Sequence, residues 1–326
     1  MPLLSRHAKA GYKKMKIFKD LEKVSIHRPV ATIGIFDGVH KAHQAIIERL
    51  ERTSEKLAGE STVVTLWPHP RIVLYKEDDE IQLLNTLEEK IFRLEEAGVQ
   101  NLVIIPFNTL FADTSFSDFV EEILVKRLNI VHLVVGYNHH FGKNREGNYY
   151  KLDQLSARLG FGLSQQAPVV IEDKKVSSSA IRHYLKEGEV NMANRFLGYH
   201  YQVGGKVVTG NRKGRELGFP TANIAVENEY KLIPGDGVYA VIAHIGDRKI
   251  EGMMNIGCRP TLMEDCRQSL IEVHLFDWDD DLYDMEIRID FIERIRDERK
   301  FGSISELKAQ ITQDKVLIKK ILTSIK

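Results

Sequence analysis

Short apolar runs alternate with amphipathic stretches over the first half of the chain, from Val30 to about Ala167. The apolar runs are VATIGIF, STVVTLW, NLVIIPF and IVHLVVGY, at residues 30–36, 61–67, 101–107 and 130–137. Continuous runs of this kind are typical of parallel strands that helices cover on both faces. The stretches between them, at 43–59, 86–98 and 115–129, have helical spacing, and two end at glycine. The pattern predicts a doubly wound, Rossmann-like α/β domain, with ligands beyond the carboxyl ends of the strands.

The pattern changes after Gly198. Runs at 201–210, 237–247, 249–257, 269–279 and 285–295 are short and separated by Gly, Asp and Pro turns. This spacing indicates an antiparallel barrel or sandwich, and we expect a barrel. Helices are expected at 177–188 and 189–198, with domains at 15–185 and 186–326. A final amphipathic helix over 303–325 should pack against the barrel through Leu307, Ile311, Val316, Ile318 and Ile321.

Composition limits the partners of the chain. Its 326 residues, 43% apolar and 28% charged, suffice for two folded domains. The 46 basic and 46 acidic residues cancel, which argues against nucleic-acid binding through phosphate neutralisation and favours small-molecule partners. No apolar run is long enough for a membrane span. Cys258 and Cys266 are too few for a disulfide framework, so we expect reduced thiols in a cytoplasmic protein, with residues 1–14 as an extension or a basic targeting arm.

The segment GIFDGVHKAHQAII, residues 34–47, joins the first strand to the first helix. Gly34 and Gly38 allow a tight turn and close approach of a ligand. His40 and His43, three apart at the helix start, can point to one side, where the helix N-terminus favours phosphate. Their imidazoles can donate hydrogen bonds to phosphate oxygens in the transition state. The alternatives are a helix-initiating turn with surface histidines, or half of a metal site that lacks further ligands nearby.

The segment GKVVTGNRKGRELGFPTANI, residues 205–224, contains no Walker motif, which excludes a P-loop kinase. Its glycines alternate with basic residues, as a backbone cradle for polyphosphate requires; a flexible solvated hairpin is the alternative. Thr221 and Asn223 lie two apart in an extended stretch and face one side. Their oxygens are ligands suited to Mg²⁺.

Glu272 alternates with Ile271 and Val273 in an expected strand, so its carboxylate points to one face. A positioned carboxylate can act as a general base. A structural glutamate on an edge strand is the alternative.

These segments resemble the signatures of bacterial bifunctional riboflavin kinase/FAD synthetases. GIFDGVHKAH is similar to G-x-F-D-G-x-H-x-G-H, and LWPHP (66–70), GYNHHFG (136–142) and SSSAIR (177–182) follow in the family's order. Residues 205–224 are similar to the riboflavin kinase signature, and the resemblance continues through GVYAV, MNIGCRPT, IEVHLFDWDDDLY and IRDERKF. The chain departs from the pattern at Ala42, where the family has glycine, and at Ser179, where it has threonine.

The resemblance implies two ATP-dependent reactions: phosphorylation of riboflavin to FMN, and adenylyl transfer to FMN, giving FAD and pyrophosphate. It implies that Glu272 is the general base of the first reaction and that His40 and His43 stabilise the triphosphate in the second. Nucleotide or phosphate contacts are implied for Gly34, Phe36, Asn138, Ser178, Ser179, Arg182, Gly205, Lys206, Gly210, Gly214 and Arg215. Flavin contacts are implied for Asp37, His69, Arg296 and Phe301, and Mg²⁺ binding for Thr221 and Asn223.

Three other functions stay open at this point. Ala42 is compatible with a riboflavin kinase whose nucleotidyltransferase domain is impaired. A non-catalytic flavin or nucleotide sensor would need no general base such as Glu272. Another adenylyl- or cytidylyltransferase of the same superfamily would leave Thr221, Asn223 and Glu272 unexplained.

Overall fold

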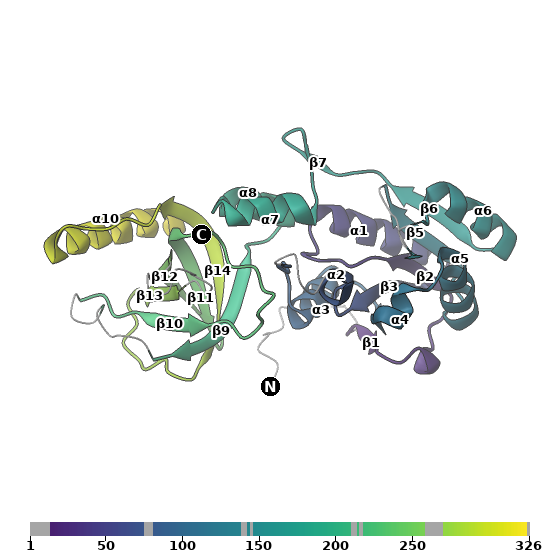
Figure 1. Cartoon of the computed structure of the whole chain (residues 1–326), viewed down its shortest axis with the longest axis horizontal. Helices are drawn as coiled ribbons and strands as arrows, with labels where there is room; N and C mark the ends of the chain where they lie inside the picture. The colour runs from purple at the N-terminus through teal and green to yellow at the C-terminus, as the bar shows by residue number, and fades with distance from the viewer. Residues whose placement is uncertain are drawn as a thin grey trace. The chain divides into compact units, whose positions relative to one another are not determined.

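The computed structural model describes residues 14–74, 81–137, 142–143, 146–209, 214, 218–257 and 270–324. The chain forms two compact units, of which the first ends at Ser177 and the second begins at Ser178 (Figure 1). The sequence suggests a domain boundary between residues 185 and 186, which stays a prediction.

The first unit contains a parallel sheet of six strands in the order β1-β4-β3-β2-β5-β6. The four apolar runs of the sequence form its centre, which confirms the doubly wound arrangement. Two further strands that show no apolar run, β1 and β6, extend its edges. The strands are β1 (Lys16–Phe18), β2 (Pro29–Ile33), β3 (Glu60–Trp67), β4 (Asn101–Pro106), β5 (His132–Gly136) and β6 (Gly162–Gln166).

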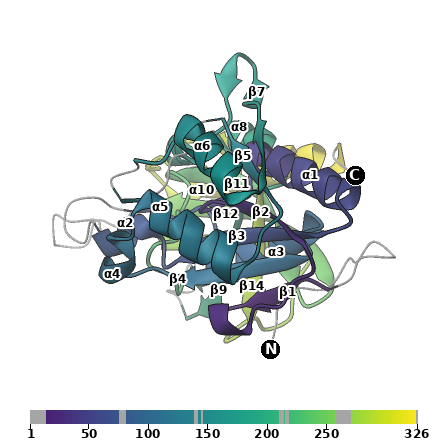
Figure 2. The same cartoon turned by 90° about the vertical axis from the view of Figure 1, so that its right-hand side faces the viewer.

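Helices cover both faces of this sheet (Figure 2). Successive strand residues point to opposite faces, so Val30 packs with Ile47 and Leu50 of α1, whereas Ala31 packs in the core that contains Phe119. One face carries α1 (Lys41–Lys56) and α3 (Leu87–Glu96); the other carries α5 (Phe116–Asp118), its π-helical continuation η2 (Phe119–Arg127) and α6 (Tyr149–Leu159). The remaining elements are η1 (Leu21–Lys23), α2 (Pro70–Leu74), α4 (Thr109–Ala112), β7 (Val170–Ile171) and β8 (Lys174–Lys175).

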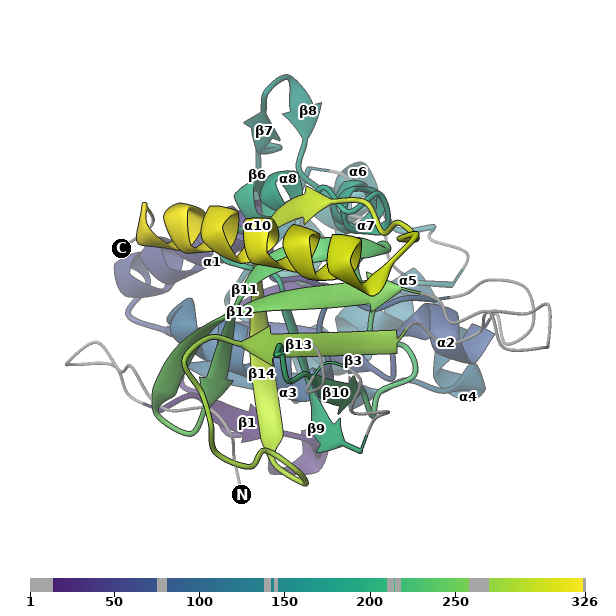
Figure 3. The ribbon, with the colours of Figure 1, turned by 90° about the vertical axis from the view of Figure 1, so that its left-hand side faces the viewer.

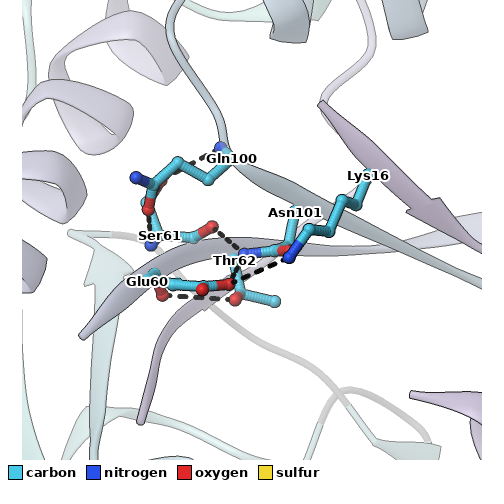
Figure 4. Close-up of polar contacts among 6 residues, drawn as sticks. All are labelled: Lys16, Glu60, Ser61, Thr62, Gln100 and Asn101. Carbon is cyan, nitrogen blue, oxygen red and sulfur yellow. Dashed lines mark hydrogen bonds and ion pairs between the residues drawn. The ribbon is translucent and has the colours of Figure 1, made fainter. Parts of the chain in front are cut away.

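Polar side chains tie together the amino ends of β3 and β4 (Figure 4). The Ser61 amide donates to Gln100 Oε1 at 2.8 Å, and the Gln100 amide donates to Ser61 Oγ at 3.1 Å. The buried Asn101 amide group donates to Glu60 Oε2 at 3.0 Å and to the Ser61 carbonyl at 3.2 Å. These contacts are structural, because ligands of such sheets bind at the opposite, carboxyl edge.

The second unit is a closed antiparallel barrel in the order β10-β13-β12-β11-β14-β9, which confirms the expected barrel. Tyr239, Met254 and Val273 face one another across neighbouring strands and are buried in its interior. The strands are β9 (Gln202–Val208), β10 (Ala222–Ala225), β11 (Gly237–Ile245), β12 (Arg248–Gly257), β13 (Leu270–Leu275) and β14 (Glu286–Arg296).

The last helix, α10 (Ile304–Thr323), lies on the outer face of the barrel, as expected (Figure 3). Its buried residues Ile318 and Leu322 pack with Val238 of β11. One expected contact is wrong: Val316 is 53% exposed. It follows the buried Asp314 by two positions, which turns it away from the barrel.

Two helices precede the barrel, α7 (Ser178–Lys186) and α8 (Val190–Leu197), close to the expected ranges. Asn194 joins α8 to the barrel, since its amide donates to the Phe291 carbonyl at 2.8 Å and its oxygen accepts from the Tyr201 amide at 2.7 Å. The Gly235 amide donates to the Leu185 carbonyl of α7 at 2.8 Å. Both helices therefore pack within the second unit. Within the described ranges, we find no helix with the length and apolar character of a membrane span.

Candidate active sites

The loop between β2 and α1, residues 34–40, follows a strand at the carboxyl edge of the sheet. Phe36 and Val39 have left-handed φ values of +51° and +34°, which are uncommon outside glycine and cluster at ligand sites. Phe36 is only 2% exposed, so its ring anchors the loop in the core. A Cβ at Gly34 would lie 3.1 Å from this ring. A larger residue at position 34 would therefore need the Phe36 ring to shift slightly.

The Asp37 carboxylate holds this loop to a neighbouring segment. It accepts hydrogen bonds from the Leu84 amide at 3.0 Å and from the Asn85 amide at 3.2 Å. The residue is buried. Asp37 therefore has a structural role in fixing the position of the loop, in addition to the flavin contact expected from the sequence.

His40 and His43 are brought together at the start of α1. His40 caps the helix by accepting from the His43 amide at 3.4 Å, and the two rings stack with centroids 3.7 Å apart. Burial lowers the pKa of His43 well below its ordinary value, and His40 and Lys90 lower it further. His43 is therefore neutral near pH 7 and has one N–H to donate. Within the described part of the chain, its Nδ1 has no hydrogen-bond partner.

The other expected residues of the nucleotidyl-transfer site lie in separate segments. His69 is buried, and its Nδ1 accepts from the Arg71 amide at 3.1 Å. Ser178, Ser179 and Arg182 lie in the first turns of α7, in the second unit. Asn138 lies outside the described residues.

In the second unit, strand register aligns residues that are far apart in the sequence. Asn223 of β10 lies opposite Glu272 of β13, Glu272 lies opposite Asn255 of β12, and Asn255 lies opposite Val238 of β11. Directly opposite residues of antiparallel strands point to the same face. Val238 packs against the residues of α10, so these side chains lie on the outer face of the barrel. We call Asn223, Glu272 and Asn255 the outer row.

Asn255 was not among the residues expected from the sequence. Its amide donates to Glu298 Oε1 at 3.2 Å. Only the register of β12 against β13 reveals that it adjoins Glu272.

The segment before β10 is held in place beside the outer row. A Cβ at Gly214 would lie 2.4 Å from the Phe219 carbonyl oxygen and 3.1 Å from Thr221 Oγ1. The absence of a side chain at Gly214 therefore allows its backbone to lie close to Thr221. The buried His274 is 2.8 Å from the Pro220 carbonyl through Nδ1, which must donate because a carbonyl only accepts. Burial lowers the pKa of His274, which favours this neutral form.

Gly205 and Lys206 lie in β9 and have structural contacts. A Cβ at Gly205 would lie 2.4 Å from the Ala225 carbonyl oxygen, so glycine allows β9 and β10 to pair. Lys206 Nζ lies 2.9 Å from Asp284 Oδ1, and this hydrogen bond raises the pKa of Lys206. Gly210 and Arg215 lie outside the described residues.

The expected flavin-binding residues of the barrel lie beside α10. Arg296, which pairs in register with Val238, binds the buried Asp314 at 2.9 Å. The Arg299 guanidinium lies 4.8 Å from the centre of the Phe301 ring. A cavity of about 450 Å³ is lined by Arg299, Lys300, Phe301, Glu306, Ala309, Gln310 and Gln313. Phe301 is the one aromatic side chain of this partly open cavity, and most of the other lining residues are polar or charged.

Comparison with known proteins finds relatives over both units. A family model described as FAD synthetase matches residues 22–180, and one described as riboflavin kinase matches residues 197–322. The bifunctional riboflavin kinase/FMN adenylyltransferase of Bacillus subtilis (strain 168) is 38% identical over 290 residues, which cover 88% of this chain and 90% of the relative. The protein of the same name from Escherichia coli (strain K12) is 36% identical over 288 residues, again 88% and 90%.

A solved structure with similar architecture comes from Streptococcus pneumoniae and is described as a macrolide-efflux protein. It is 27% identical, covers 94% of this chain and 99% of its own, and has a TM-score of 0.85. With both domain models matched and relatives more than one-third identical over most of its length, the chain belongs to the bifunctional riboflavin kinase/FMN adenylyltransferase family.

Proposed function

We propose that the barrel unit transfers a phosphoryl group from ATP to riboflavin, and that the first unit transfers an adenylyl group from ATP to the resulting FMN. The observation that carries the first assignment is the outer row, in which Glu272 lies between Asn223 and Asn255. The second rests on the strained loop 34–40 and the stacked histidines at the start of α1.

In the kinase reaction, Glu272 accepts the proton of the ribityl 5′-hydroxyl. The hydroxyl oxygen then attacks the γ-phosphorus of ATP, and ADP leaves. Thr221 and Asn223 face the nucleotide, and the flavin ring occupies the cavity beside Phe301. The Thr221 hydroxyl and the Asn223 amide oxygen are hard donors that fit Mg²⁺, which leaves the half-buried Glu272 carboxylate to act as the base. The described residues include no group of three or more His, Cys, Asp or Glu that could hold a metal. A bound Mg²⁺ would therefore rely on nucleotide phosphates as well, and it would neutralise their charge.

In the adenylyl transfer, an oxygen of the FMN phosphate attacks the α-phosphorus of ATP, and pyrophosphate leaves. No nucleophilic side chain is needed, so the protein must align the reactants and stabilise charge. The neutral His43 donates one hydrogen bond to a phosphate oxygen. Ser178, Ser179 and Arg182 are proposed phosphate contacts on the strength of the family motif, and a guanidinium suits bidentate binding.

The competing function, a riboflavin kinase with an impaired first unit, depends on Ala42. Ala42 lies in the first turn of α1 and is not among the described residues with positive φ. Its backbone therefore does not require glycine, which favours two working activities. We also propose a cytoplasmic location, in keeping with the low cysteine content.

The deciding experiment supplies the purified protein with riboflavin, Mg²⁺ and ATP and separates riboflavin, FMN and FAD by chromatography. Accumulation of FAD is the expected result. FMN alone would identify a kinase with an impaired first unit, and unchanged riboflavin would indicate a binding protein. A parallel reaction that starts from FMN isolates the adenylyl transfer.

A further inference from the structure

Lys90, in the middle of α3, is a buried charge that no motif includes. It is 1% exposed, among the largest fully buried side chains of the protein. Lysines are almost never fully buried unless they are paired. Among the described residues, we find no hydrogen bond or ion pair of its ammonium group, which lies near the Trp67 ring and interacts electrostatically with Asp37. Removing an ammonium from water without a partner carries a large free-energy cost.

The aromatic ring places this charge at the carboxyl edge of the sheet. Lys90 Nζ lies 4.9 Å from the centre of the Trp67 ring. Trp67 is the last residue of β3 and is partly exposed, so the ammonium lies near a ring at the edge where ligands bind.

Electrostatic interactions connect Lys90 with the loop between β2 and α1. Burial lowers the pKa of Lys90 to about 8, and Asp37 opposes this change. Lys90 in turn lowers the pKa of His43. Because His43 is neutral and Asp37 is an anion, neither supplies the positive charge that a phosphate requires.

We propose that Lys90 is a phosphate-binding residue of the adenylyl-transfer site, whose ammonium takes phosphate oxygens of FMN or ATP as the partner that it lacks in the free protein. This inference rests on the proposed function of the first unit. The bound phosphate offsets the free-energy cost of burying the ammonium. The ion pair that forms therefore stabilises the complex at the phosphate groups that react. Because Lys90 is 1% exposed, contact with a ligand requires neighbouring side chains to move.

A purely structural role for Lys90, in which it supports Trp67, makes opposite predictions. Loss of the ammonium would then destabilise the first unit and leave the phosphate affinity of the folded protein unchanged. A phosphate-binding role requires the reverse, because the free protein gains nothing from an unpaired buried charge.

The test uses the full-length protein with Trp278→Phe, which leaves Trp67 as the reporter, since the chain has two tryptophans. Lys90→Met is compared with Lys56→Met, which removes an exposed lysine at the end of α1. Trp67 fluorescence, which reports the first unit alone, is measured during titration with pyrophosphate. Steady-state FAD formation from supplied FMN gives kcat and the KM values for FMN and ATP. Riboflavin phosphorylation by the other unit checks each sample.

Lys90→Met should weaken pyrophosphate binding by about 10- to 100-fold, as expected for loss of a hydrogen bond to a charged group. Lys56→Met should leave it unchanged, and Lys90→Arg should restore part of it. A rise in the KM for FMN alone would assign the flavin phosphate, whereas a lower kcat or a higher KM for ATP would assign the triphosphate; either result supports the proposal.

Unchanged pyrophosphate binding in Lys90→Met would overturn the inference, and so would unfolding of its first unit. If the unsubstituted protein makes no FAD, the proposed function fails. The pyrophosphate titration still decides the role of Lys90 in that case.

Discussion

Replacing Lys90 by methionine is expected to stabilise the free first unit at pH 7, although it removes a charged side chain at the candidate site. Burial lowers the pKa of this lysine from the ordinary 10.5 to about 8. At about 1.4 kcal/mol per pH unit, this interval corresponds to a cost of about 3 kcal/mol for keeping the ammonium buried. The contact with Trp67 is worth about 0.5–2 kcal/mol, so the cost of burial is the larger quantity.

The pH dependence of unfolding separates this effect from ordinary repacking. Below pH 8 the lysine is protonated in both the folded and the unfolded chain, and the full cost applies. Between about pH 8 and 10.5 the folded chain loses this proton while the unfolded chain keeps it, so the wild-type stability rises relative to the variant. The advantage of Lys90→Met should therefore be largest at pH 7 and should disappear near pH 10.5.

Denaturant unfolding followed by Trp67 fluorescence, in the Trp278→Phe background, measures the free energy of unfolding of this unit. Asp37 and His43, which interact with Lys90, are present in both proteins, so the difference between the two curves isolates the lysine. Parallel stability curves from pH 7 to 10.5, or a variant that is less stable at pH 7, would refute the reasoning.

Four further substitutions test the two sites and the fold. Glu272→Gln should lower riboflavin phosphorylation by about 10²–10⁴-fold, the usual contribution of a general base, while FAD formation from supplied FMN continues; a normal kinase rate would remove Glu272 from the mechanism. His43→Ala should lower FAD formation by about 10²–10³-fold through loss of a donor to charged oxygens, and Ala42→Gly should leave it equal or faster, both measured with FMN supplied. Asn101→Ala should lower the free energy of unfolding of the first unit by about 1–3 kcal/mol, because a buried carbonyl loses its donor; unchanged denaturant midpoints would contradict this.

The fold was predictable where local patterns carry it. The central strands of the sheet are buried on both faces and appear in the sequence as apolar runs. The edge strands β1 and β6 were missed because one has three residues and the other, GLSQQ, is mostly polar and only half-buried. A strand of this kind forms because it pairs with a neighbouring strand that is distant in the sequence. A local sequence pattern does not contain this information.

The candidate sites divide in the same way. The residues of the loop 34–40 are neighbours in the sequence, so their motif could be recognised directly. The outer row depends on the pairing of three strands, and Asn255 enters it through register alone. The closed barrel sets both the order in which the strands pair and their exact register. A shift of one residue would move every side chain of a strand to the other face.

Two buried charged residues show what spacing can and cannot predict. In α3, Lys90 lies three residues after Leu87 and four before Leu94, so helical spacing places it on the buried face. In α10, Asp314 has a similar position relative to Ile311 and Ile318, and it too is buried. Spacing could thus have identified both residues as buried charges.

Their consequences differ because their partners differ. Asp314 binds Arg296 at 2.9 Å, so its charge is compensated within the protein and helps to fix α10 on the barrel. Lys90 has an aromatic ring and no anion in contact among the described residues. A buried pair can be retained for structure, whereas a buried ammonium without an ion-pair partner lowers stability and is a candidate for binding a ligand. Three-dimensional contacts, which spacing does not reveal, thus separate the structural charge from the one that we assign to phosphate binding.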